Sequence, residues 1–262
     1  MADNKSALLA AEDADVGGAS LQQAAPRGSR AGVAICSTLT HVLAISTFAL
    51  VVRLILKYYD FGAPADGSQA AIPSFEFGTF GTHPLLMVTA FGLLSPVATV
   101  AYKTYESLLG VSHTVMKLVH AFLQTAATLI GAVGVASMYE THKGALHFQT
   151  AHSWLGLGAM VLFAVQWLFG TLVYLNPWSP GWLRAKLMST HVAVGTISIF
   201  LTLMAVFSGP IALVWRPVEA GGQVQKDVWQ LANASAITSA LLLISVFMTF
   251  WESSRIHLGK AQ

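Results

Sequence analysis

Four of the nine histidines in this 262-residue chain lie one apiece inside consecutive apolar runs. They are His83, His120, His152 and His191. An ionisable side chain inside a membrane span is costly and usually has a function. His83 and His120 are 37 residues apart and His152 and His191 are 39 apart, so a unit of two apolar segments, each with one histidine, occurs twice.

The apolar runs are long enough to cross a bilayer as helices. A helical span needs about 20 mostly apolar residues, and long continuous runs of this kind span lipid as helices. The chain is 55% hydrophobic and 10% charged, whereas soluble domains carry about 25% charged residues. The sequence therefore predicts an all-α integral membrane protein. Its six transmembrane helices are expected at about 31–56, 81–102, 114–138, 150–175, 187–214 and 228–251.

The remaining segments are short and polar. Residues 1–30 lack the apolar core of a signal peptide, and their composition predicts a disordered tail. Residues 31–252 form the predicted membrane domain, and residues 253–262 form a short C-terminal tail. Six spans place both termini on one side, together with nine of the fourteen Lys and Arg residues. The positive-inside rule therefore predicts cytosolic termini, in a plasma or organelle membrane that the sequence does not specify.

The direction of each span places the four histidines in two layers. The second and fourth spans run inward, and His83 and His152 lie near their outer starts. The third and fifth spans run outward, and His120 and His191 lie one to two turns past their cytosolic starts. Each layer thus offers two imidazoles from parallel helices, and at about 1.5 Å per residue the layers are roughly 15 Å apart.

Two imidazoles at one level suit haem iron better than zinc. Structural zinc takes about four ligands in a tetrahedron, whereas two axial imidazoles complete six-coordinate haem and favour electron transfer. A single cysteine, Cys36, excludes a covalent C-x-x-C-H haem attachment and a cysteine-held iron–sulfur cluster. The prediction is two noncovalent b haems. Gln124 and Gln166 could bond a propionate or a ligand, or could simply join helices, whereas His41 is read as a packing histidine.

With these residues in place, the chain resembles the cytochrome b561 family of ascorbate-dependent transmembrane oxidoreductases. The resemblance implies a central four-helix bundle that holds two haems, flanked by the first and last helices. It implies that cytosolic ascorbate reduces the inner haem, and that the outer haem reduces monodehydroascorbate or a ferric chelate. It also assigns His83 and His152 to the outer haem and His120 and His191 to the inner one. The matching segments are His83–Met87, Lys117–His120, Ala151–Gly156 and His191 after Lys186.

Two groups of side chains are candidate substrate sites. Ascorbate is a small anion, so a site for it near a haem edge needs cations. For each of these cations an ordinary positive-inside or snorkelling role stays open, although Lys117 lies where a span should be apolar. The cytosolic candidates are Lys117, Lys186, Lys103 and Arg184. The outer candidates are His142, Lys143, His147 and Phe148, in a segment that looks most like the short cytochrome b561 domain-containing proteins.

Three classes of function are compatible with these features. The favoured class is an ascorbate-dependent transmembrane oxidoreductase of the ferrireductase or monodehydroascorbate reductase type. The second is a dihaem oxidoreductase with a quinol or flavoprotein donor, and the third is a haem-free transporter or scaffold. The net charge of +2 gives no sign of nucleic-acid binding. The expected partners are ascorbate, its acceptor and the lipid bilayer, and a homodimer is left open.

Overall fold

The computed structural model describes residues 30–61, 81–144, 147–219 and 223–258. Within these segments every regular element is helical, and six helices are long and apolar enough to cross a membrane. The predicted all-α membrane fold with six spans is therefore confirmed. The predicted N-terminal tail lies outside the described residues except for Arg30, and so do the last four residues of the chain.

Each predicted span corresponds to one helix or to several helical pieces that follow one another along the chain. The first span is α2 and the third is α6, while α8 and α9 are the fifth and sixth. Short π-helical pieces interrupt the second span, and one such piece ends the fourth span. π-Helical pieces are frequent at functional sites. The bounds are α2 Arg30–Phe61; α3 Thr82–Met87, η1 Val88–Leu94, α4 Ser95–Ala101, η2 Tyr102–Glu106 and α5 Ser107–Leu109; α6 His113–Thr141; α7 Ala151–Gly170 and η3 Thr171–Leu175; α8 Gly181–Glu219; and α9 Lys226–Leu258.

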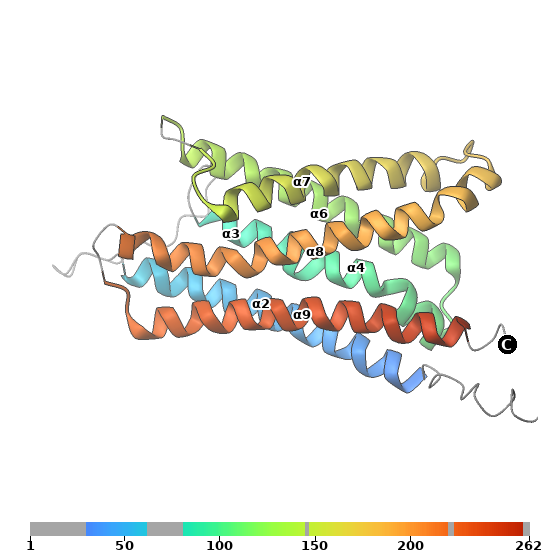
Figure 1. Cartoon of the computed structure of the whole chain (residues 1–262), viewed down its shortest axis with the longest axis horizontal. Coiled ribbons are helices and arrows are strands. Elements are labelled where there is room, and N and C mark those ends of the chain that lie inside the picture. Colours follow the sequence, from blue (N-terminus) through green and yellow to red (C-terminus); the bar gives the residue numbers. More distant parts are fainter. Residues whose placement is uncertain (1–29, 62–80, 145–146, 220–222, 259–262) are drawn as a thin grey trace, which may run out of the picture.

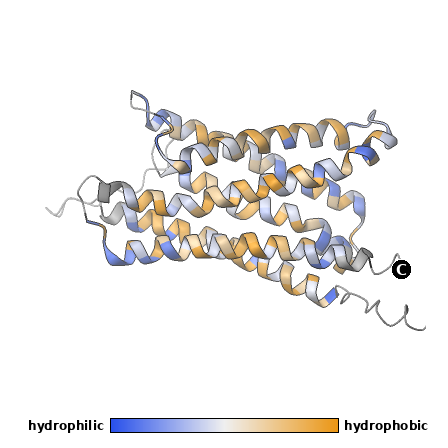
Figure 2. Cartoon of the chain, in the orientation of Figure 1, coloured by the Kyte–Doolittle hydropathy of each residue, from blue (hydrophilic) through white to orange (hydrophobic). Residues whose placement is uncertain are grey.

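The six spans run side by side along the long axis of the molecule (Figure 1). The four histidine-bearing spans form one bundle, in which α3 and α4 pack on α6, and α7 packs on α8. The outermost spans, α2 and α9, pair with each other along the side of this bundle. The start of α2 and the end of α9 lie at the same end of the molecule. The apolar middles of the helices and their hydrophilic ends form the pattern expected across a bilayer (Figure 2).

Side-chain caps fix where two of the histidine-bearing helices begin. Ser112 has extended backbone before α6, and its hydroxyl accepts a hydrogen bond from Val115 N at 3.4 Å. Thr150 does the same before α7, with Ser153 N at 3.2 Å. Such caps satisfy amide donors that the first helical turn leaves free. The second cap sets the register of His152, which is the second residue of α7.

Glycine allows α6 to approach the second span closely. A Cβ at Gly134 would lie 2.9 Å from Met87 Sδ, closer than real Cβ contacts, and 3.2 Å from Leu86 Cβ, tighter than most of them. A Cβ at Gly131 would lie 2.7 Å from the ring of Phe91. Small residues at helix crossings bring backbones together in this way. The close approach places the backbone of α6 next to His83, at the start of α3.

Candidate haem sites

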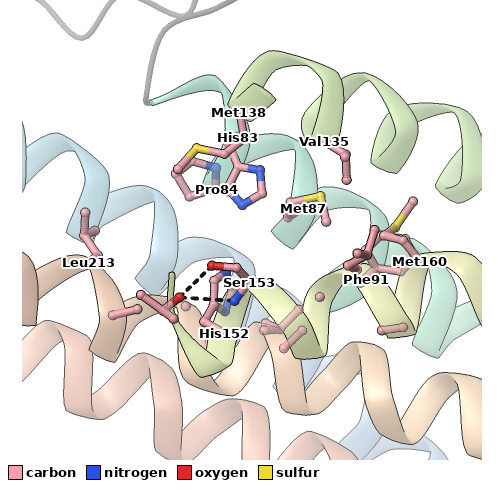
Figure 3. A pocket seen from close by; sticks show the side chains of 18 of the residues that line it. His83, Pro84, Met87, Phe91, Val135, Met138, His152, Ser153, Met160 and Leu213 are labelled. Atoms are coloured by element: carbon pink, nitrogen blue, oxygen red, sulfur yellow. Dashed lines mark hydrogen bonds between the residues drawn. The ribbon is translucent and has the colours of Figure 1, made fainter. Parts of the chain in front are cut away.

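The outer histidines face each other across a space of the right size for one haem iron. His83 on α3 and His152 on α7 have ring centres 6.4 Å apart, with their planes at 86° (Figure 3). A metal–imidazole nitrogen bond is about 2.0 Å long, so two imidazoles on opposite faces of one iron have ring centres roughly 6 Å apart. The separation of this pair therefore fits two axial ligands of one haem.

An apolar cavity of about 310 Å³ surrounds this pair. Its size falls at the lower end of the range for ligand pockets, about 300 to 1,000 Å³. His83 and His152 both line it, and Met87, Phe91 and Met160 are among the side chains that form its apolar wall. A few polar groups in a mostly apolar pocket are typical of a cofactor site. This space and its ligand pair fit a flat apolar cofactor better than a bare metal ion.

The hydrogen bonds of the outer pair leave the Nε2 atoms available for a metal. His83 Nδ1 lies 3.0 Å from the carbonyl oxygen of Gly134, which can only accept, so Nδ1 carries the proton. His152 Nδ1 lies 3.0 Å from Ser208 Oγ. The Ser208 hydroxyl donates to the carbonyl of Ala205 at 3.1 Å, so its oxygen is free to accept from His152. Metal-binding histidines usually have such a partner on the other nitrogen, which fixes the ring and its tautomer.

The inner histidines lie on α6 and α8 and have partners on the neighbouring spans. His120 Nδ1 donates to the carbonyl of Ala98 at 2.8 Å. His191 Nδ1 lies 2.8 Å from the side-chain amide of Gln166 on α7. In the described part of the chain, His, Cys, Asp and Glu form no group of three or more that could hold a metal ion.

The structure adds two tyrosines to the inner layer that were not assigned to it from the sequence. The Tyr102 ring centre is 5.6 Å from that of His120, and the Tyr174 ring centre is 4.9 Å from that of His191. Both tyrosines lie in π-helical pieces, η2 and η3, at the ends of the second and fourth spans that are far from His83 and His152. One sequence signal was available, because each tyrosine lies at the end of an inward span, where the depth argument puts the inner layer.

A comparison with known proteins identifies the family. Residues 82–215 match the model of the eukaryotic cytochrome b561 family, and this region makes up 134 of the 262 residues. The chain belongs to this family. Cytochromes b561 are haem b proteins, and the matched region starts one residue before His83 and includes all four histidines.

Several curated relatives share this region of the cytochrome. The lysosomal membrane ascorbate-dependent ferrireductase CYB561A3 of Bos taurus is 34% identical over 156 residues, 59% of this chain and 56% of that protein. The plasma membrane ascorbate-dependent reductase CYBRD1 of Mus musculus is 34% identical over 131 residues, 48% of this chain and 43% of that protein. The transmembrane ascorbate ferrireductase 2 of Arabidopsis thaliana is 36% identical over 132 residues, 50% of this chain and 56% of that protein. The chain spans about half the length of the curated relatives it matches.

The four cations predicted for the cytosolic side differ in how firmly they are held. Lys117 is half-buried on α6, one turn before His120, and Lys186 is exposed on α8. Lys103 is half-buried in η2. Arg184 donates from Nη2 to the carbonyl of Asn176 at 2.9 Å, which holds the turn between the fourth and fifth spans. The Arg184 guanidinium is therefore partly committed to the backbone, whereas Lys186 is exposed to an incoming anion.

Three of the four outer candidates line the cavity that contains His83 and His152, namely His142, His147 and Phe148. The fourth, Lys143, is exposed and pairs with Glu140 at 3.3 Å instead of lining the cavity. The His147 ring stacks on Tyr139 with centres 4.6 Å apart and planes at 7°. Phe148 has a φ of 55°, a left-handed conformation that bulky residues rarely adopt. His142, His147 and Phe148 therefore lie at the cavity of the outer histidine pair.

One prediction tests whether the close approach at Gly134 serves the outer site. Gly134→Ala should weaken haem binding at the outer site, because the new methyl group would push Leu86 and Met87 away from α6 and with them His83. The substitution keeps the carbonyl of residue 134 but separates it from His83, and loss of such a partner of a metal-bound histidine typically costs about 10- to 100-fold in affinity. Haem content of the purified variant measures the effect. Gly158→Ala is the matched control, since a Cβ there meets nothing within 4 Å. Equal haem content in the two variants would contradict the prediction.

Proposed function

We propose that this cytochrome b561 transfers electrons across its membrane, from cytosolic ascorbate through two b haems to monodehydroascorbate or ferric iron on the opposite side. The observation that carries the proposal is the 6.4 Å separation of the His83 and His152 rings, which suits two axial ligands of one iron. The names of the relatives, ascorbate-dependent ferrireductases and reductases, support ascorbate as donor and ferric iron as acceptor.

The four histidines would hold the two cofactors in this proposal. His83 and His152 would bind the outer haem through Nε2, and His120 and His191 would bind the inner one. Bound haem iron supplies one-electron transfer between its ferric and ferrous states, and two axial imidazoles leave no open position for oxygen. The chain keeps both ligands of each pair at one depth by placing them on parallel helices.

Apolar side chains fill the space between the two layers. Phe91 lies in its span between His83 and Ala98, whose carbonyl bonds to His120, and Phe163 lies between His152 and Gln166, whose amide bonds to His191. Their rings meet edge to face with centres 5.0 Å apart. Both side chains are buried. This buried aromatic pair excludes water from the middle of the bundle, between the two histidine layers.

The donor side of the proposal uses the cations at the cytosolic end of the bundle. Lys117 and Lys186, with Lys103 and Arg184 nearby in the chain, would attract the ascorbate anion to the inner layer. Clustered charge of one sign raises the local concentration of a small ion of the opposite sign. Arg184 would act mainly by holding the turn, since its guanidinium already donates to Asn176.

The acceptor side uses the segment over the outer cavity. His142 and His147 have ring centres 6.1 Å apart, and both line the cavity of the outer histidine pair. Imidazole is a good ligand for iron, so these rings suit a ferric chelate at the outer mouth. Phe148 would limit access, because it lines the same mouth and packs against Trp154 with ring centres 5.5 Å apart.

The first test of this function is haem stoichiometry. The purified chain, expressed with ample haem, should give two noncovalent b haems per protein in a pyridine haemochrome assay, because it has two histidine layers. Both should be reduced when ascorbate is added to the air-oxidised protein. One haem or none per chain would refute the two-layer arrangement. Two haems that ascorbate leaves oxidised, but a quinol reduces, would refute the choice of donor.

A further inference from the structure

The two proposed haem sites share a pattern in how their ligands are held. In each pair the histidine of the first unit, His83 or His120, donates to a backbone carbonyl. The histidine of the second unit, His152 or His191, faces a side chain instead. A carbonyl can only accept, so it allows one tautomer, whereas a hydroxyl or an amide can either donate or accept. The second-unit ligands are thus held by groups that a substitution can replace.

Gln166 makes the most specific of these side-chain contacts. Its amide Nε2 lies 2.8 Å from His191 Nδ1 and 2.7 Å from the carbonyl oxygen of His191. The amide therefore holds both the ring and the backbone of one residue across the contact between α7 and α8.

Two glycines make room for this contact. A Cβ at Gly195, one turn after His191, would lie 3.1 Å from Gln166 Nε2. A Cβ at Gly170, one turn after Gln166, would lie 3.1 Å from His191 Cε1. Each distance is tighter than an ordinary van der Waals contact. The amide and the imidazole therefore sit in a slot that small residues on both helices keep open.

We propose that Gln166 is the positioning residue of the inner haem, and that its amide orients His191 and sets how strongly this imidazole donates to iron. The inference rests on the proposed function, because it takes His120 and His191 as the inner ligands. A ring bound to iron through Nε2 carries its proton on Nδ1 and needs an acceptor there. Turning the amide by about half a turn exchanges its nitrogen and oxygen, so that Oε1 accepts that proton and the amide gives up its bond to the His191 carbonyl.

The acceptor at Nδ1 affects the iron through the ring. A stronger acceptor draws the Nδ1 proton, makes the imidazole a better donor and stabilises ferric over ferrous iron. Gln166→Leu removes the acceptor and should raise the midpoint potential of the inner haem. Gln166→Glu supplies an ionised acceptor and should lower it. A tenfold change in the ratio of ferric to ferrous affinity corresponds to about 59 mV for one electron, and we expect shifts of about that size.

The experiment uses the full-length chain loaded with haem. Haem content is measured first, so that a chain with fewer than two haems counts against the proposed function and not against Gln166. Equilibrium potentiometric titration and the EPR g-values of the two ferric centres are then compared among the wild type and both variants. Only one of the two midpoints should move, in opposite directions for Gln166→Leu and Gln166→Glu, and only the matching EPR signal should change.

Trp167→Phe is the matched control. It removes a hydrogen bond of 2.9 Å between Trp167 Nε1 and Thr125 Oγ1 in the same turn of α7, and this bond joins α7 to α6 without touching a histidine. The control should leave both midpoints in place. Unchanged midpoints in Gln166→Leu, or shifts equal to those of the control, would overturn the proposal. If Gln166→Leu loses the inner haem, Gln166→Glu should retain it, and loss of that haem in both variants would also overturn it.

Discussion

His83→Ala and His152→Ala should each remove the same haem, and His120→Ala and His191→Ala should each remove the other. The second and fourth spans run parallel, so their histidines share one depth, and the ring centres of His83 and His152 are 6.4 Å apart. Each single substitution removes one of two axial ligands and leaves the iron with one imidazole. About half of the haem should be lost, and the absorption and EPR spectra of the remaining haem should be identical within a pair and different between pairs.

His41→Ala is the control for this series. His41 lies in α2, a span outside the bundle of histidine-bearing helices, and both of its ring nitrogens have protein partners. Its Nδ1 bonds to the carbonyl of Ser37 at 2.7 Å, and its Nε2 accepts from the hydroxyl of Tyr105 at 2.9 Å. The variant should keep both haems. If His83→Ala gave the same spectrum as His120→Ala, the assignment of the layers from span direction would be wrong.

The sequence predicted the fold because membrane spans carry a strong signal. Twenty or so apolar residues without charge can be counted, and the alternating directions of consecutive spans follow from that count. The pairing of His83 with His152 came from the same reasoning, and the structure brings these rings together. The π-helical pieces in the second and fourth spans could not be predicted, since they change the backbone hydrogen bonds without changing the apolar pattern.

The hydrogen-bond partners of the histidines could not be predicted from the sequence, for a different reason. Gly134 and Ala98 act through their carbonyl oxygens, which every residue has, so the residue type carries no signal. Ser208 is one of many hydroxyl residues in the apolar spans, and only the packing of α7 on α8 selects it. Arg184 was grouped with the substrate cations by its charge, yet its Nη2 bonds to a backbone carbonyl within its own turn. Such contacts depend on how the helices pack and not on their composition.

The two-unit organisation of the chain links these observations. The first unit presents its histidines to backbone carbonyls, which fix the proton on Nδ1 and leave Nε2 available for a metal. The second unit presents His152 and His191 to Ser208 and Gln166, whose side chains can be exchanged by a single substitution. Under the proposed assignment, substitutions of the side chains that bond to the second-unit histidines should shift the haem potentials.

Lys117→Ala should keep both haems, slow reduction by ascorbate about tenfold and leave reduction by dithionite nearly unchanged. A lysine costs about 2.5 to 3.5 kcal/mol at the centre of a membrane helix and less near an end where it can reach the interface. Lys117 is half-buried in α6, three residues before His120 and so on a neighbouring part of the helix surface. That placement suits a cation that holds an anionic donor beside the inner layer. Stopped-flow absorbance at the haem bands measures both rates.

The defect should be larger in the double variant Lys117→Ala with Lys186→Ala, because two cations then no longer attract the anion. It should also shrink as salt is added, since ions screen exposed charges beyond about 8 to 10 Å at physiological ionic strength. Lys57→Ala is the control, because Lys57 lies near the opposite end of the bundle, in α2, and pairs with Asp227 at 3.6 Å. Reduction by ascorbate at the wild-type rate would show that Lys117 takes no part in donor binding. Loss of the inner haem would instead show that this lysine supports the cofactor, for example by pairing with a haem propionate, and not the substrate.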